Sequence, residues 1–165
     1  MKNYLFILFL FLSTQSCGIY SFTGGDTGSA KTMQIDFFPN KATLVEPIVS
    51  QKFTTELQDL FLRQTNLSLV RSDGDLFYEG EITDYRIVPI SATAQQTASQ
   101  NRLTITINVR FYNKTKEDDD FEKSFSFFSD FDANQQLSGT ILEDALSEIF
   151  ERITQDIFNA SLAKW

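Results

Sequence analysis

Residues 102–111 read RLTITINVRF, and no other stretch of the chain alternates as cleanly. Large apolar side chains occupy the odd positions, and polar or charged side chains occupy the even positions. A period of two is typical of a β-strand with one buried face, because successive side chains of a strand point to opposite sides. The stretch therefore predicts a strand that packs one face on a core and presents a polar face on the other side.

The segment 31–38 shows the same alternation at the start of the expected domain. Met33, Ile35 and Phe37 are predicted on its buried face. The chain shows strand character in three further segments, which are 67–71, 76–90 and 121–131.

In the segment 76–90, the strand period separates two sets of side chains. Leu76, Tyr78, Gly80 and Ile82 are expected on one face, and Tyr85 is expected on the other. The pair Asp73-Gly74, which lies between the segments 67–71 and 76–90, is a strong β-hairpin signal. We therefore expect 67–71 and 76–90 to form a hairpin.

Two helices are predicted, one before and one after the strand segments 67–131 in the sequence. The first begins at Pro47, where a missing N–H is harmless, and ends near Asn66. The second is capped by Ser138 or Thr140, and the stretch from Thr140 to Glu143 fits a capping box. Apolar residues recur at helical spacing in both, at Val49, Phe53, Leu57, Leu60 and Phe61, and at Leu142, Leu146, Ile149, Ile153 and Ile157.

These elements predict a fold of the α+β class, a two-layer sandwich. We expect a mixed sheet of four to five strands with the two amphipathic helices on one face. The long helix between the first two strands permits parallel pairing there, which makes the sheet mixed. Residues 31–165 are expected to form this single domain.

The N-terminus carries the features of a secretion signal. Lys2 is followed by an uncharged apolar run, Tyr4–Leu12, which is too short to span a bilayer as a helix. The stretch 14–17, Thr-Gln-Ser-Cys, resembles the lipobox of bacterial lipoproteins, where the signal is cut before a cysteine that receives lipid. Residues 1–16 are thus predicted to be a lipoprotein signal peptide and Cys17 to carry an N-acyl diacylglycerol group. An ordinary signal peptide followed by an incidental free cysteine is the alternative.

Residues 17–30 are rich in Gly, Ser and Thr and are predicted to be a tether behind the lipidated residue. Ile19, Tyr20 and Phe22 interrupt this composition with large apolar groups. They are candidate partner-binding residues, and packing back on the domain is an equally weighted alternative.

Composition excludes several kinds of chemistry. The chain has no histidine and one cysteine, which rules out Ser-His-Asp and Cys-His catalysis and imidazole zinc sites. Without the signal, which contains Lys2, the chain has 13 basic and 22 acidic side chains, so its net charge is −9. A negative charge of this size disfavours nucleic acid as a partner. We predict no enzymatic activity, no metal site and no cofactor besides the lipid.

Three basic side chains are candidates for binding a phosphate-bearing glycolipid. Arg102 and Arg110 lie on the polar face of the main strand, and Lys114 follows it. A solvated strand face, with ion pairs from Arg102 or Arg110 to Glu79 or Glu81, is the competing interpretation.

Several short motifs, none of them chemically specific, occur in an order and spacing that cover the mature chain. They are 17–24, 37–40, 72–76, 79–82, 101–105, 125–132 and 156–159.

Together these motifs resemble the lipopolysaccharide-assembly lipoprotein family LptE, in its Bacteroidetes form. The resemblance implies an outer-membrane lipoprotein anchored by its lipid. No acidic run directly follows Cys17 and Gly18, which by resemblance to known sorting rules of lipoproteins favours the periplasmic face. The family resemblance also implies a plug and assembly partner of the β-barrel LptD, with lipopolysaccharide as a contact. A lipoprotein adaptor of another envelope complex, such as a barrel-assembly or transport auxiliary, is the alternative function. A carboxylate-based hydrolase of envelope glycans would need two acidic residues converging in a cleft, and the sequence offers no such pair.

Overall fold

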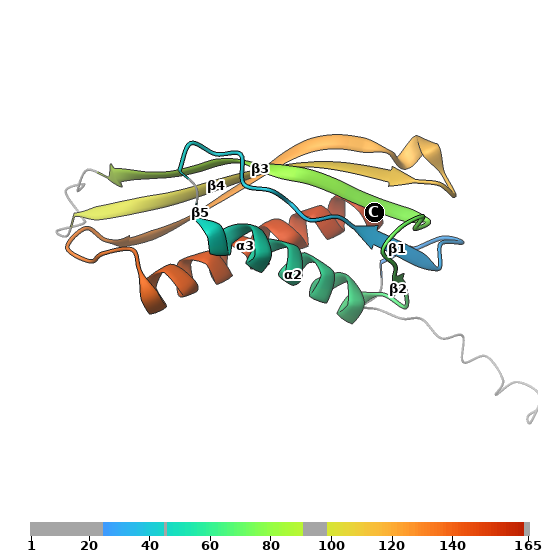
Figure 1. The fold of residues 1–165 in the computed structure, drawn as a ribbon, viewed down its shortest axis with the longest axis horizontal. Coiled ribbons are helices and arrows are strands. Elements are labelled where there is room, and N and C mark those ends of the chain that lie inside the picture. Colours follow the sequence, from blue (N-terminus) through green and yellow to red (C-terminus); the bar gives the residue numbers. More distant parts are fainter. Residues whose placement is uncertain (1–24, 45, 91–98, 164–165) are drawn as a thin grey trace, which may run out of the picture.

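A computed structural model describes residues 25–44, 46–90 and 99–163, and it shows two layers. One layer is a β-sheet, and both long helices lie on the same side of it (Figure 1). The α+β two-layer sandwich predicted from the sequence is therefore confirmed. The elements are β1 (Thr32–Ile35), α2 (Pro47–Gln64), β2 (Ser68–Leu69), β3 (Leu76–Ile90), β4 (Gln100–Asn113), the short 3-10 helix η1 (Glu117–Asp119), β5 (Phe121–Asp132) and α3 (Gly139–Leu162).

The sheet has five strands in the order β2-β1-β3-β4-β5. β1 pairs in parallel with both β2 and β3, whereas β3, β4 and β5 pair antiparallel over almost their full lengths. The predicted mixed sheet is thus correct. β4 is hydrogen-bonded on both sides, which makes it the central long strand.

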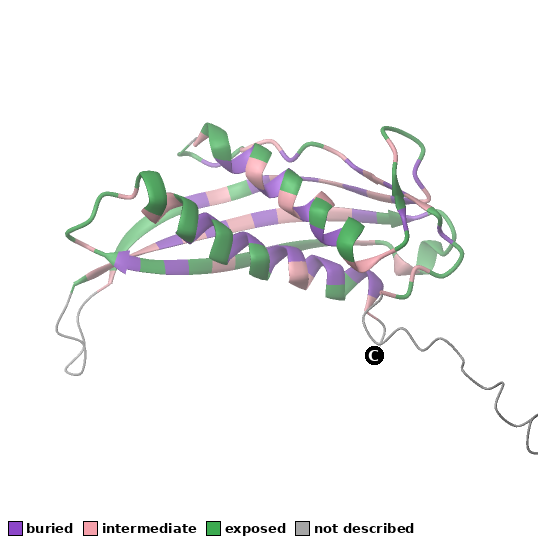
Figure 2. Cartoon of the chain, turned by 90° about the horizontal axis from the view of Figure 1, so that it is seen from below, coloured by how far each residue is buried: buried purple, intermediate pink, exposed green. Residues whose placement is uncertain are grey.

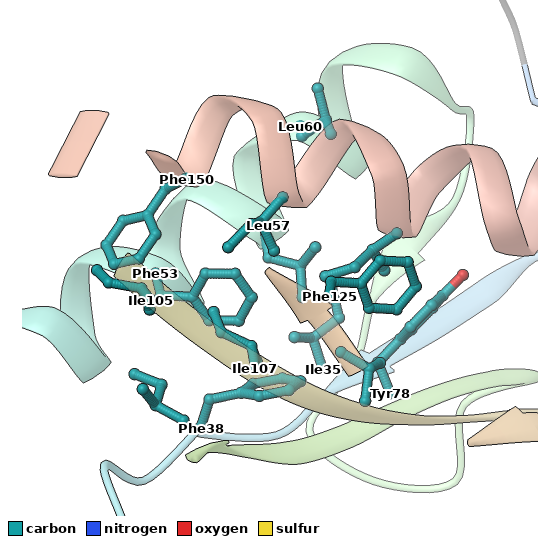
Figure 3. Close-up of a cluster of buried hydrophobic side chains, with 14 of the residues drawn as sticks. Ile35, Phe38, Phe53, Leu57, Leu60, Tyr78, Ile105, Ile107, Phe125 and Phe150 are labelled. Carbon is teal, nitrogen blue, oxygen red and sulfur yellow. The ribbon is translucent and has the colours of Figure 1, made fainter. Parts of the chain in front are cut away.

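The core lies between the inner face of β4 and the two helices. All five odd-numbered apolar residues from Leu103 to Phe111 are completely buried. The predicted stripes of α2 and α3 pack on them, except that Leu142 is only half buried. Aromatic rings connect the layers edge to face, with Phe53 between Phe38 and Phe150, as Figure 3 shows.

The first strand departs from its predicted pattern after Ile35. Phe37 was expected in the core, but it is 56% exposed and its neighbour Phe38 is completely buried. The reason is that β1 ends at Ile35, so the alternation stops. The Phe38 N–H then donates to the Thr54 hydroxyl of α2, which holds this residue against the helix layer.

Gly80 of β3 provides the space that Phe38 needs. A Cβ atom at Gly80 would lie 2.7 Å from Cε1 of Phe38 and 2.0 Å from the Asn108 carbonyl oxygen of β4. Both distances are far below van der Waals contact, so this position accepts only glycine without a backbone shift. The ring of Phe38 fills the place of the missing side chain.

β3 changes face midway because of a bulge. Its register against β4 shifts between Ile82 and Asp84. The sequence predicts Tyr85 on the other face of the strand from Leu76 and Ile82. In the structure it lies on the same inner face as these residues and is 7% exposed. An extra residue in one strand reverses the parity of all later side chains.

The predicted hairpin at Asp73-Gly74 is wrong. β2 and β3 are not neighbours, because β1 lies between them. The segment instead crosses the start of β1, where the Asp75 carboxylate accepts the backbone N–H groups of Lys31 and Thr32. These two hydrogen bonds lower the pKa of Asp75 below its usual value.

The helix ends also differ in detail from the sequence prediction. α2 ends at Gln64 with Thr65 as an extended C-cap, one residue before Asn66. The N-cap of α3 is Ser138, as one of the two alternatives had it, but no side-chain capping hydrogen bond forms, so the predicted capping box is absent.

The end of the predicted tether is packed on the domain. The Asp26 N–H donates to the carbonyl oxygen of Leu162 at the end of α3. A Cβ atom at Gly25 would lie 2.8 Å from the ring of Phe158. The chain therefore enters the domain at the C-terminal end of α3.

We predict that Gly80→Ala destabilises the protein by about 2 kcal/mol or more, because the added methyl group overpacks a site bounded by backbone. Urea unfolding of the purified protein in detergent measures the loss. Gly28→Asn is the control, since Gly28 has a φ of 55° and a Cβ atom there would meet nothing within 4 Å. Equal stability of Gly80→Ala and the wild type would contradict the packing described here.

Candidate functional site

Both described helices lie on one side of the sheet (Figure 1), and we call the opposite side the outer face. It consists of the β3, β4 and β5 side chains that point away from α2 and α3, including every even-numbered residue of β4 and β5. None of the even-numbered residues of β4 and β5 is buried. Hydroxyl groups link its strands, as where Thr106 and Ser126 form a hydrogen bond of 2.9 Å. The outer face is therefore a polar surface built on rigid strands.

Arg110 pairs with two carboxylates on the outer face. Its Nε donates to Oε1 of Glu79 at 2.8 Å, and its terminal nitrogens donate to Glu81 at 3.2 and 3.3 Å. The two carboxylates raise the pKa of Arg110, and the Arg110 hydrogen bonds lower the pKa of Glu81. The ion pairs predicted for this arginine are confirmed.

Arg102 pairs with a different partner from the one predicted. Cross-strand register places it beside Val88 and Asp130, so it cannot reach Glu79 or Glu81. It donates two hydrogen bonds to the Asp130 carboxylate, at 2.7 and 2.8 Å, and its guanidinium carbon lies 3.6 Å from the centroid of Phe128. The Asp130 hydrogen bonds raise the pKa of Arg102.

The three candidate glycolipid contacts do not form one site. Arg102 and Arg110 are eight residues apart on β4, a separation of about 27 Å at 3.3–3.4 Å per residue. Lys114 lies beyond the end of the strand and pairs with Asp73 at 2.5 Å. Each cation is already neutralised by a carboxylate of the same chain.

Large apolar side chains lie at both ends of the outer face, and none of them was among the site residues expected from the sequence. Phe77 and Tyr112 stack with centroids 5.8 Å apart near one end. Val88 and Phe128 lie beside Arg102 near the other end and are 41% and 40% exposed. The adjacent residues Phe127 and Phe128 gave the available signal, because two consecutive strand residues cannot both face the core.

The residues predicted at the membrane end lie outside the described part of the chain. These are Cys17, Ile19, Tyr20 and Phe22. Across residues 25–44, 46–90 and 99–163, no group of three or more Asp, Glu, His or Cys side chains is arranged to hold a metal ion. Within the same residues, no helix has the length and apolar character to cross a membrane.

Fold and surface together define a small α+β domain with a helix layer on one sheet face and a polar, internally paired surface on the other. Comparison with protein families then gives the family. The LptE family, described as lipopolysaccharide-assembly, matches residues 30–161, and the chain belongs to this family. The resemblance found in the sequence is confirmed, and it gives the protein a role in lipopolysaccharide assembly.

Solved structures share the fold at very low sequence identity. A hypothetical protein from Chlamydia trachomatis aligns with a TM-score of 0.54 and 8% identity, over 82% of this chain and 100% of that one. A minor lipoprotein from Acinetobacter baumannii aligns with a TM-score of 0.51 and 9% identity, over 81% and 92%. PelC from Paraburkholderia phytofirmans, a dodecamer, gives 0.50 and 5%, over 84% and 94%. No curated protein matches the sequence.

We predict that Arg110→Gln raises the pKa of Glu81 toward its usual value, because the guanidinium no longer favours the carboxylate. A lowered carboxylate pKa stabilises the fold above the unfolded-state value, and this contribution disappears as pH falls through the folded-state value. The variant should therefore lose less stability on acidification through this range.

An NMR titration of the Glu81 side chain measures the change directly. Arg86→Gln is the matched control, since Arg86 pairs with Asp84 and not with Glu81. An unchanged Glu81 pKa in Arg110→Gln would show that the Arg110 contact does not exist in solution.

Proposed function

We propose that this protein is an outer-membrane lipoprotein that acts as plug and assembly partner of an LptD-type β-barrel in lipopolysaccharide transport. The observation that carries the proposal is the family match, which spans nearly the whole described domain. The protein would act without enzymatic chemistry, by occupying the barrel lumen and stabilising the assembled barrel. Its attachment to the membrane would be the lipid on Cys17, with the domain on the periplasmic side.

The outer face supports this proposal through its polarity. The interior of a large membrane β-barrel is polar, so a plug needs a hydrogen-bonding surface. On the outer face, Arg110 and Arg102 are already paired with Glu79, Glu81 and Asp130. Contact with a barrel wall would therefore leave no unpaired charge on these side chains, which is the costly case. We propose that the outer face lies against the wall.

We propose that the three candidate cations contact lipopolysaccharide, although they are not equally accessible to its phosphate groups. Arg102 and Arg110 would have to exchange carboxylate partners for a phosphate. Lys114 is more accessible, since its side chain is 51% exposed and its partner Asp73 is 94% exposed. We therefore rank Lys114 first among the phosphate contacts, and we assign Ile19, Tyr20 and Phe22 to docking near the anchor.

Purification of the tagged protein from detergent-solubilised outer membrane tests the function. We expect a large β-barrel of the LptD type to be recovered in equimolar amount. Recovery of a different envelope barrel would instead support an adaptor of another complex. Recovery of no barrel would contradict the proposal.

We predict that Cys17→Ser folds normally but leaves the membrane, because stable anchoring requires two or more acyl chains. Flotation of the protein with lipid vesicles, in the absence of other proteins, measures the anchor. Ser21→Ala is the control, since it retains Cys17 and should float like the wild type. Flotation of Cys17→Ser to the wild-type extent would exclude the lipid anchor.

A further inference from the structure

β5 forms a long border of the sheet. It extends from Phe121 to Asp132, twelve residues, and pairs with β4 on one side only. Figure 2 shows it at the rim of the sheet, with no described strand on the side away from β4. The opposite border is formed by β2, which has two residues. Among the described residues, β5 is the longest border: residues 83–90 of β3 also lack a partner on the side away from β4, but that stretch is shorter and contains Pro89.

This border lacks most of the features that normally protect edge strands. Proteins block such edges with proline, bulges, very short strands or inward-pointing charges. β5 contains neither proline nor glycine, and its register against β4 is continuous from Phe121 to Asp132. Lys123 is the one inward-facing charge, and its ammonium group lies 5.1 Å from the centroid of Phe125. Most of the strand is open to pairing.

The register shows which backbone groups face outward. The Ala133 N–H donates to the Ser99 oxygen, in the same register as the β4–β5 ladder. Directly opposed residues alternate between hydrogen-bonded and non-hydrogen-bonded pairs in an antiparallel ladder. Odd-numbered residues of β5 therefore bond to β4. The N–H and C=O groups of the even-numbered residues, such as Ser124, Ser126 and Phe128, point away from the sheet.

A groove runs beside this border, where an added strand would place its inward side chains. It is lined by residues 123–126 of β5 and by Asp156, Asn159 and Ala160 of α3. Phe125 contributes an apolar surface and is almost completely buried. Asp156 and Lys123 contribute opposite charges. The groove can accept a small or polar side chain from a neighbouring strand.

A second copy of this chain is a poor occupant. The outer-face side chains of β5 are acidic, hydroxyl or aromatic, and none is basic: Glu122, Ser124, Ser126, Phe128, Asp130 and Asp132. Two β5 strands pairing antiparallel about a two-fold axis, in either of the registers with greatest overlap, would place Glu122 opposite Asp130 or Asp132 of the second copy. Like charges directly opposed across two strands are destabilising.

We propose that β5 pairs with an extended segment of the barrel partner, and that this segment carries basic side chains on the outer-face side. Among the described residues, Glu122 and Asp132 have no ion-pair partner, so a basic side chain opposite either gains an opposite charge. This inference rests on the proposed function, because it takes the barrel as the source of the segment. The backbone supplies affinity and the alternate side chains supply selectivity, as in other β-strand additions.

Hydrogen exchange on the wild-type complex tests strand addition directly. The full lipidated protein is purified alone and together with the co-expressed barrel, and amide exchange is followed for β5. We expect exchange at Ser124, Ser126 and Phe128 to slow at least tenfold in the complex. The amides of Phe125 and Phe127 already bond to β4 and serve as internal controls. Unchanged exchange at all three even-numbered positions would overturn the proposal.

Ser126→Pro supplies an independent test. Proline removes one outward-facing N–H and leaves the β4 ladder intact, as edge strands allow. Ser126→Val is the matched control, because it loses the same Thr106–Ser126 hydrogen bond but keeps the N–H. We expect the proline variant to recover about tenfold less barrel than the valine variant, which corresponds to about 1.4 kcal/mol.

The outcomes separate the two proposals. If the wild type recovers the barrel and Ser126→Pro recovers as much as Ser126→Val, the β5 inference is wrong and the proposed function stands. If the wild type recovers no barrel, both are wrong. A dimer of the isolated wild type that Ser126→Pro abolishes, measured by light scattering, would show that the border binds a second copy and would overturn the inference.

Discussion

β4 can bury only one of its faces, and the rest of the structure depends on this constraint. Its five odd-numbered apolar side chains, Leu103 to Phe111, are completely removed from water. Burial of each such side chain stabilises the fold by about 1.5–3 kcal/mol of free energy. The five together stabilise it by on the order of 10 kcal/mol, and this is an upper estimate because the unfolded chain already buries part of its apolar surface. A register slip of one residue would expose this surface and bury Arg102 and Arg110 instead. Both helices cover the apolar face of β4, and the outer face is polar, because the two faces of this strand differ in this way.

The same constraint determines how the surface can bind. Arg102 and Arg110 of the outer face are held by carboxylates on the neighbouring strands, so the middle of this face presents hydroxyl groups and paired ions. Such a surface is suited to a polar wall, whereas the open border of β5 is suited to a peptide backbone. The two surfaces adjoin along β5, so one large partner can contact both.

Local periodicity predicted the elements that pack as simple layers. The limits of β3 and β5 come close to or match the predicted ranges, and the Arg110 pairs follow from two strands and their alternation. The wrong predictions share a cause: the end of a strand or a bulge changes which side chains face the core, and the local sequence gives little sign of either. Phe38 replaces Phe37 in the core because β1 ends at Ile35 and Gly80 opens a space for its ring.

Strand order and register were the other features that the sequence did not predict. The bulge that turns Tyr85 inward depends on how β3 meets β4. The partner of Arg102 depends on the register of β5, which places Asp130 opposite it. The Asp73-Gly74 signal has ordinary turn chemistry, but β1 separates the strands it was expected to join. Register and strand order involve residues far apart in the sequence, so neither could be derived from segments considered singly.

If a barrel wall covers the outer face, a side chain in the middle of this face loses contact with solvent in the complex. A cysteine introduced by Thr106→Cys stands in the middle of this face, opposite Asp84 on β3 and Ser126 on β5. Its rate of reaction with a water-soluble maleimide should be measured for the isolated protein and for the protein purified with its barrel. We expect rapid labelling of the isolated protein and at least tenfold slower labelling in the complex. Equal labelling rates in the two states would show that the barrel does not cover the outer face.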